Sequence, residues 1–153
     1  MEIVETSSRQ QLDRVRELFH EYWRAFDFSP CFQNFTAEVD GLPGGYTPPR
    51  GRLALALVDG AAAGCIAMRP LAPTACEMKR LYVREAFRSH GTGIALVRWL
   101  INEARETGYS RMYADTMPVM ARALAMYERL GFQRTSPYSP TATDGAIYLS
   151  LDL

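Results

Sequence analysis

The chain has 153 residues, which is enough for one domain and too few for two ordinary ones. Hydrophobic residues make up 48% and charged residues 22%, a balance that argues against a largely disordered chain. The formal net charge at pH 7 is zero, with 17 Lys and Arg against 17 Asp and Glu. Proteins that bind nucleic acid through phosphates, or an anionic membrane, normally carry a basic excess. We therefore expect neither nucleic acid nor a membrane as a partner.

The N-terminus and the cysteines favour a cytoplasmic protein. Residues 1–5 have neither the basic start nor the apolar core of a secretory signal, and apolar stretches such as Leu53–Val58 are far too short to span a membrane. Cys31, Cys65 and Cys76 are odd in number and show no metal-binding spacing. We expect reduced thiols and no bound metal.

The first third of the chain predicts a strand, a helix and a less regular segment. Residues 2–5 alternate weakly, as in a strand, and Ser7 or Ser8 caps the helix that follows. The apolar residues of this helix recur at helical spacing and are Leu12, Val15, Leu18, Phe19, Tyr22, Trp23 and Phe26. Ser29-Pro30 ends or bends the helix. Phe32, Phe35 and Val39 then mark a short second helix, before a loop over residues 41–49 that is rich in Gly and Pro.

The middle of the chain predicts a hairpin and a further strand. Leu53–Val58 is a continuous apolar strand, Asp59-Gly60 supplies a tight turn, and residues 64–68 return as the partner strand. Pro70 and Pro73 then interrupt the chain before a strand over Glu77–Val83.

The rest of the chain predicts helix, strand, helix and final strands. The first helix has its apolar face at Ile94, Val97, Leu100, Ile101 and Ala104, and Gly108 ends it. Arg111–Asp115 is a short strand, after which Thr116 caps a helix with Pro118 in its first turn. That helix has Met120, Ala123, Leu124, Tyr127 and Leu130 on one side, and the last strand alternates through Ile147, Leu149, Leu151 and Leu153. This order predicts a single α/β domain over residues 1–153.

Residues 77–95 have the features of an anion site, because a strand leads through a glycine-bearing loop into a helix. The first N–H groups of a helix lack internal partners and favour negative charge. Gly91 and Gly93 let the backbone approach a ligand, and Arg88 adds positive charge. A purely structural role, in which the glycines allow the helix to pack closely on the strand, stays open. No lysine follows Gly93 as in a Walker loop, and the third glycine of a dinucleotide fingerprint is missing.

Three linked segments resemble the GNAT superfamily of acyl-CoA N-acyltransferases. Arg88-x-x-Gly91-x-Gly93 is similar to the Q/R-x-x-G-x-G/A pattern with which that family holds the pyrophosphate of CoA. Glu77–Val83 resembles the family's fourth strand, and residues 123–132 resemble its A-x-x-[LM]-Y-x-x-x-G-F segment. The resemblance extends from about Leu53 to Phe132. It implies a mixed, mostly antiparallel sheet with helices on both faces and splayed central strands.

The resemblance also implies acetyl-CoA as co-substrate and a set of residues that bind it. These are Leu81, Tyr82, Val83, Arg88, Ser89, His90, Gly91, Thr92, Gly93 and Ile94. The backbone of residues 81–83 pairs with the pantetheine arm as another strand would, and the loop amides surround the pyrophosphate. The chain departs from the family pattern at Ser89, where a glycine often stands, and at Met120, where many members have an asparagine.

The implied reaction is attack of a primary amine on the thioester, through a tetrahedral intermediate that expels the CoA thiolate. Glu77 is our candidate for the base that removes the amine proton, and Asp115 is a weaker one. The alternative interpretation of Glu77 is a strand-end carboxylate paired with Lys79, Arg80 or Arg111. Tyr127 matches the tyrosine thought in the family to protonate the thiolate, although its place on an apolar helix face also suits a core residue.

We expect the acceptor to be a small metabolite or an amino acid. By family architecture it enters over the loop at residues 41–49, the first helix and residues 137–140. The aromatic residues Tyr22, Trp23, Phe26, Phe28 and Phe32 either line this pocket or, as their spacing favours, pack in the core. Two alternatives stay open, a non-catalytic acyl-CoA-binding module and a nucleotide-binding switch. A homodimer also stays open.

Overall fold

The computed structural model describes residues 1–25, 35–138 and 145–153. The expectations for Phe26, Phe28, Cys31, Phe32 and residues 139–140 lie outside these ranges.

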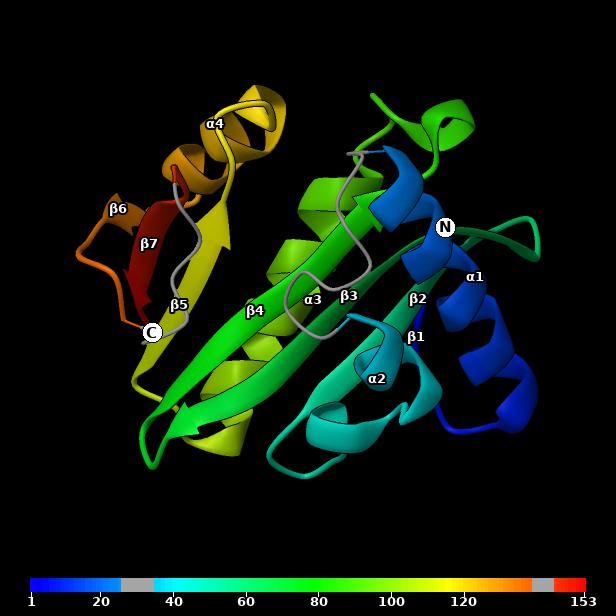
Figure 1. Ribbon diagram of the computed structural model, residues 1–153, viewed down its shortest axis with the longest axis horizontal. Coiled ribbons are helices and arrows are strands. Elements are labelled where there is room, and N and C mark those ends of the chain that lie inside the picture. Colours follow the sequence, from blue (N-terminus) through cyan, green and yellow to red (C-terminus); the bar gives the residue numbers. More distant parts are fainter. Residues whose placement is uncertain (26–34, 139–144) are drawn as a thin grey trace.

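Seven strands form one sheet in the order β1-β2-β3-β4-β5-β7-β6 (Figure 1). The strands are β1 (Glu2–Glu5), β2 (Arg52–Val58), β3 (Ala61–Ala72), β4 (Ala75–Val83), β5 (Arg111–Thr116), β6 (Gln133–Arg134) and β7 (Ile147–Asp152). Every neighbouring pair is antiparallel except β4 and β5, which run parallel. The prediction of a mixed, mostly antiparallel sheet is confirmed.

Helices cover both faces of this sheet, as expected. α1 (Arg9–Ala25) and α2 (Phe35–Asp40) lie on one face, and α3 (Thr92–Thr107) and α4 (Ala121–Arg129) lie on the other (Figure 1). Two short 3₁₀ turns, η2 (Gly44–Tyr46) and η3 (Glu85–Phe87), lie in the connections. The expected loop at residues 41–49 therefore contains one helical turn.

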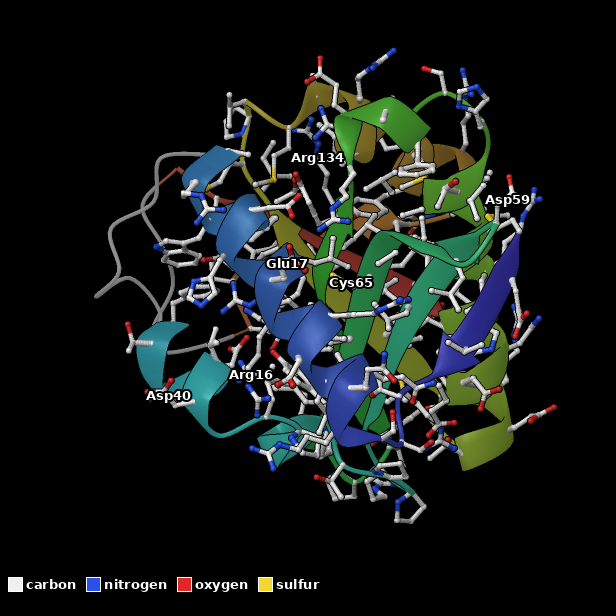
Figure 2. The ribbon with its side chains drawn as sticks, turned by 90° about the vertical axis from the view of Figure 1, so that its right-hand side faces the viewer. Arg16, Glu17, Asp40, Asp59, Cys65 and Arg134 are labelled. Carbon is white, nitrogen blue, oxygen red and sulfur yellow. The ribbon has the colours of Figure 1, made fainter. Side chains whose placement is uncertain are left out.

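An apolar core lies on each side of the sheet because side chains alternate along its strands. Leu53 and Leu55 of β2 pack on the α1 side, whereas Ala54 and Ala56 belong to the core under α3. Cys65 of β3 lies fully buried beneath α1 and is a free thiol (Figure 2).

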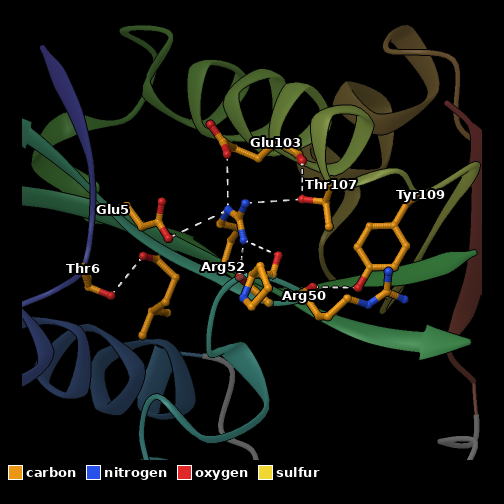
Figure 3. Close-up of polar contacts among 10 residues, drawn as sticks. Glu5, Thr6, Arg50, Arg52, Glu103, Thr107 and Tyr109 are labelled. Atoms are coloured by element: carbon orange, nitrogen blue, oxygen red, sulfur yellow. Dashed lines mark hydrogen bonds and ion pairs between the residues drawn. The ribbon is translucent and has the colours of Figure 1, made fainter. Parts of the chain in front are cut away.

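Hydrogen bonds from two arginines hold the helices in place. Arg16 of α1 donates from Nε to the carbonyl oxygen of Val39 in α2 at 3.1 Å. Arg52 of β2 reaches α3, where its Nε lies 3.2 Å from Glu103 Oε2 and its guanidinium donates to Thr107 Oγ1 at 3.3 Å (Figure 3). The polar residues off the apolar face of α3 thus fasten the helix to the hairpin.

Two expected boundaries are wrong. Pro70 does not end a strand, because β3 continues to Ala72, with Pro70 opposite Cys76 of β4. The pairing of β3 with β2 ends at Met68, so this part of β3 is an edge where proline costs no hydrogen bond.

Thr116 does not cap a helix. It is the last residue of β5, opposite Ile147 of β7, and its hydroxyl donates to the sulfur of Met120 at 3.5 Å. α4 begins only at Ala121. Pairing with a strand 31 positions further along the chain therefore overrides the local capping signal.

Candidate active site

The two central strands separate after a short parallel contact. β4 pairs with β5 only between residues 75–77 and residues 111–113, and beyond that point the strands diverge (Figure 1). The splay expected from the family resemblance is therefore confirmed. From Met78 to Val83, the side of β4 that faces β5 has no strand partner.

A β-bulge bends β4 within this unpaired stretch. Cys65 and Ala67 of β3 are two residues apart, but their partners Tyr82 and Lys79 are three apart, so β4 contains one extra residue. Arg80 lies in the bulge with a φ of +61°. Gly64 of β3 makes the close approach possible, since a Cβ there would lie 2.5 Å from the carbonyl oxygen of Tyr82.

A cavity of about 630 Å³ occupies the space between the separated strands. Its walls come from β4, the turn into α3, the end of β5 and α4. The lining includes Tyr22, Met78, Lys79, Arg80, Leu81, Tyr82, Val83, Arg88, Ser89, Gly91, Thr92, Gly93, Ile94, Asp115, Met120, Arg122, Met126, Tyr127 and Arg129. The lining of this cavity thus includes both the N-terminus of α3 and Tyr127.

The structure brings nearly all the expected cofactor-binding residues to this cavity. Nine of the ten line it, and the exception is His90, which is exposed and lies outside the lining. Arg88 Nε donates to the carbonyl oxygen of Val83 at 2.8 Å, so the arginine is anchored to the end of β4. Its guanidinium carbon lies 5.8 Å from the centre of the Tyr82 ring.

The loop backbone at the α3 N-terminus takes conformations that favour glycine. Gly91 precedes the helix with a φ of +81°. Ser89 has a φ of +67°, so the residue that departs from the family pattern lies in the left-handed region where glycine is preferred.

Gly93 has room for a methyl group. A Cβ at Gly93 would lie 3.7 Å from Val83 Cγ2 and 3.8 Å from Met126 Sδ, which are ordinary contact distances. Close packing of helix on strand therefore does not require glycine here. This observation favours a ligand as the reason for Gly93.

Tyr127 is both a core residue and a residue of the cavity wall. Its side chain is 5% exposed and its ring lies 5.6 Å from that of Phe132. Burial raises the pKa of Tyr127, with Tyr22 and the negative charge of Asp115 adding to the effect. The phenol thus stays protonated and able to donate. The two interpretations of Tyr127 are compatible in this arrangement.

Glu77 lies deep in a polar network beside the cavity and not in its lining. Its carboxylate is 2.8 Å from Arg69 Nε and 3.9 Å from Lys79 Nζ. It also accepts a hydrogen bond from the Tyr138 hydroxyl at 2.7 Å. Among the expected ion-pair partners, Lys79 lies near Glu77, whereas Arg80 pairs with Glu38 and Arg111 pairs with Asp152.

Asp115 has a different environment. It is half-buried at the end of β5 and lines the cavity. Within the described ranges, no hydrogen bond or ion pair engages its carboxylate. The pKa of Tyr127 is raised by burial, by Tyr22 and then by the charge of Asp115. The pKa of Lys79 is lowered by burial, and the charge of Asp115 opposes this effect. Asp115 is therefore the carboxylate best placed to meet a cation in the cavity.

Only some of the residues expected to line the acceptor pocket lie at the cavity. Tyr22 of α1 lines it, and burial raises the pKa of Tyr22 to about 12. Trp23 packs in the core instead, stacked on Phe35 with ring centres 4.1 Å apart. The loop at residues 41–49 lines a separate hollow of about 130 Å³, next to Glu38 and Arg69.

Sequence reasoning missed the α4 wall above Tyr127. Arg122, Met126 and Arg129 line the cavity from that helix. Their spacing of four and then three residues was a readable signal, because it places them on one helix face.

Two features looked for in the sequence are not seen in the described residues. None of the described helices is long and apolar enough to cross a membrane. No three His, Cys, Asp or Glu side chains in those ranges are grouped so that they could hold a metal ion.

Taken together, the cavity fits an extended ligand with a phosphate group at the α3 turn and a reactive end near Tyr127. Comparison with known proteins assigns the chain to a family. The model of the Acetyltransferase (GNAT) family matches residues 12–132. The chain belongs to this family and is an acetyltransferase.

Individual relatives agree with this assignment. An uncharacterised N-acetyltransferase of Schizosaccharomyces pombe is 36% identical over 146 residues, which cover 94% of this chain and 90% of the relative. A GNAT-family acetyltransferase of Staphylococcus aureus has the same fold, with a TM-score of 0.84 at 18% identity over 99% of this chain and 98% of its own. A GNAT-family acetyltransferase of Elizabethkingia anophelis, solved with acetyl-CoA bound, has a TM-score of 0.71 at 19% identity over 99% and 97% of the two chains.

Proposed function

We propose that this acetyltransferase transfers the acetyl group of acetyl-CoA to a primary amine of a small molecule or an amino acid. The observation that carries the proposal is the single cavity that joins the α3 turn to Tyr127 along the unpaired edge of β4. An elongated thioester with a diphosphate at one end suits such a cavity. The Elizabethkingia anophelis relative with acetyl-CoA bound supports the choice of co-substrate.

Binding would use main-chain groups at both ends of the cavity. The amides of Thr92, Gly93 and Ile94 open α3 and have no partners within the helix, so they suit the pyrophosphate. Arg88 adds a positive charge beside them. The peptide groups of residues 81–83 suit the amides of the pantetheine arm, by addition of an extended ligand to a strand edge.

The amine must lose a proton before it attacks the thioester. At pH 7 this costs a lysine-like amine about 4–5 kcal/mol unless the site assists. Glu77 and Asp115 remain the two candidates for the base. The geometry favours Asp115, since its carboxylate faces the cavity while that of Glu77 is engaged by Arg69, Lys79 and Tyr138.

The remaining steps need a polarised carbonyl and a protonated leaving group. A backbone N–H near Leu81 would stabilise the oxyanion of the tetrahedral intermediate. The raised pKa of Tyr127 keeps its phenol protonated, so Tyr127 would stabilise the departing thiolate by donating a hydrogen bond to it.

The acceptor class follows from the groups around this end of the cavity. Asp115 would attract a cationic amine, and the lining there is formed by Tyr22, Lys79 and Arg80 as well. The cavity is a hollow between elements and not an open basic surface, which suits a small acceptor. We also propose the cytoplasm as the compartment, because Cys65 and Cys76 are free thiols.

The proposal is tested by CoA release from acetyl-CoA with a panel of primary amines. We expect turnover with at least one amine, and a loss of about 100-fold in kcat for Tyr127→Phe with little change in acetyl-CoA affinity. Tyr148→Phe is the matched control, because Tyr148 is similarly buried, its hydroxyl has no hydrogen-bond partner among the described residues, and it does not line the cavity.

Two other outcomes would point elsewhere. Tight binding of CoA without turnover on any amine would favour a non-catalytic module. Competition of ATP or GTP with CoA, without thioester chemistry, would favour a nucleotide-binding switch.

A further inference from the structure

Two arginines of α4 line the rim of the cavity, and the binding of pyrophosphate does not account for them. Arg122 and Arg129 are exposed and both belong to the cavity lining. In the described part of the chain, neither guanidinium has a hydrogen bond or an ion pair. The whole chain has no net charge, so two uncompensated cations at one cavity rim are a local concentration of positive charge.

The helical repeat places both arginines on one stripe of α4. Arg122 precedes Met126 by four residues and Arg129 follows it by three, so they flank it by one turn on either side. Ala123 and Tyr127 lie on the neighbouring stripe and also line the cavity. The arginines are therefore at the rim of the wall whose deeper part holds the phenol.

Met126 connects this stripe to the turn at the α3 N-terminus. Its sulfur lies 3.8 Å from the position that a Cβ on Gly93 would take. The stripe of α4 that carries both arginines therefore lies beside the α3 turn, on the opposite wall of the cavity. That turn already offers its own cation, Arg88, and the free amides of the helix.

The charges of CoA exceed what the α3 turn neutralises. Its pyrophosphate carries about two negative charges, and its 3′-phosphate, a monoester on the ribose, carries between one and two more near neutral pH. A guanidinium binds such a phosphate through paired, charge-assisted hydrogen bonds. Arg88 and the helix amides suit the pyrophosphate, which leaves the monoester without a partner on that wall.

We propose that Arg122 and Arg129 bind the 3′-phosphate of CoA and make the enzyme select CoA over dephospho-CoA. The inference rests on the proposed function, since it assigns a further subsite to the same cavity. Dephospho-CoA differs from CoA only by this phosphate, so the comparison isolates the subsite.

The test is calorimetric titration of the full chain with CoA and with dephospho-CoA. We expect the parent to bind CoA about tenfold more tightly, and the preference to shrink at high salt. Arg122→Ala combined with Arg129→Ala should remove most of the preference by weakening CoA binding alone. Arg105→Ala is the control for a lost surface charge, because Arg105 lies in the last turn of α3 and does not line the cavity.

Three other results of the titration would each refute a specific claim. Equal affinity of the parent for both ligands would refute the subsite and leave the proposed function standing. Equal weakening of both ligands by the double variant would assign the arginines to the pyrophosphate, and so refute the inference. Binding of neither ligand by the parent would refute the proposed function itself.

Discussion

The guanidinium of Arg80 makes two hydrogen bonds to the carboxylate of Glu38, at 2.8 and 3.0 Å. Arg80 is the bulge residue of β4, and Glu38 belongs to α2 on the face opposite α3 and α4. Both side chains are largely buried, with 4% and 16% of their surface exposed. The pair thus fastens α2 to the point where β4 turns away from β5.

Removal of this pair should destabilise the protein. Because Glu38→Gln removes a charged partner of the buried Arg80, we expect a loss of about 3 kcal/mol in the free energy of unfolding. Urea unfolding measures the effect. Glu128→Gln is the control, since Glu128 forms an exposed pair with Arg134 at 4.0 Å, and it should cost less than about 0.5 kcal/mol. An equal effect of both substitutions would contradict the assigned role.

The two candidate bases should respond differently to neutralisation. We expect Asp115→Asn to lower kcat at least about tenfold, with little change in stability. Glu77→Gln should chiefly destabilise the fold, by about 2–4 kcal/mol, because Arg69 and Lys79 lose a buried partner. Steady-state kinetics and urea unfolding on both variants separate the two effects. A large loss of kcat in a folded Glu77→Gln variant, with kcat unchanged in Asp115→Asn, would restore Glu77 as the base.

Gly93→Ala separates a ligand role from a packing role. The helix interior favours alanine over glycine by about 0.5–1 kcal/mol, and the structure has room for the methyl group, so stability should rise or stay unchanged. Affinity for acetyl-CoA should fall, since the methyl group occupies the surface where the pyrophosphate would lie. Thermal melting and calorimetry test the two parts. A destabilised variant with unchanged affinity would show that Gly93 serves packing alone.

Stability should decrease above pH 10. Burial raises the pKa of Tyr22, Tyr46, Tyr127 and Tyr138 above the ordinary value of 10.0. Below pH 10 both the folded and the unfolded chain keep the phenolic protons, whereas above it only the unfolded chain releases them. Stability present below pH 10 is therefore lost as the pH rises.

Burial lowers the pKa of Lys79, which makes stability rise with pH, but this is one group against the four tyrosines. Urea midpoints at about pH 9 and pH 11 measure the net change. Tyr127→Phe should flatten this dependence. A midpoint that does not fall would contradict the burial of these phenols.

The sequence was sufficient for the hairpin turn and for the C-terminal end of α3, which depend on neighbouring residues. The hairpin turn at Asp59-Gly60 joins β2 and β3, and α3 ends at Gly108, which has a φ of +101°. The loop from Arg88 to Gly93 was identified as an anion site, and all of it except His90 reaches the cavity. Turn chemistry and helix caps depend on residues a few positions apart, so a linear pattern records them.

Other features are decided by segments far apart in the chain. The bulge at Arg80 depends on Gly64 of β3 and on Glu38 of α2, and nothing near Arg80 signals it. The local sequence predicts a helix cap at Thr116, whereas in the structure Thr116 pairs with Ile147 of β7. The sequence by itself determined most of the elements, the position of the glycine-bearing loop before α3 and the family. Only the tertiary structure decided that Asp115 faces the cavity while Glu77 is bonded to its neighbours, because side-chain direction and partners depend on how distant strands pair and separate.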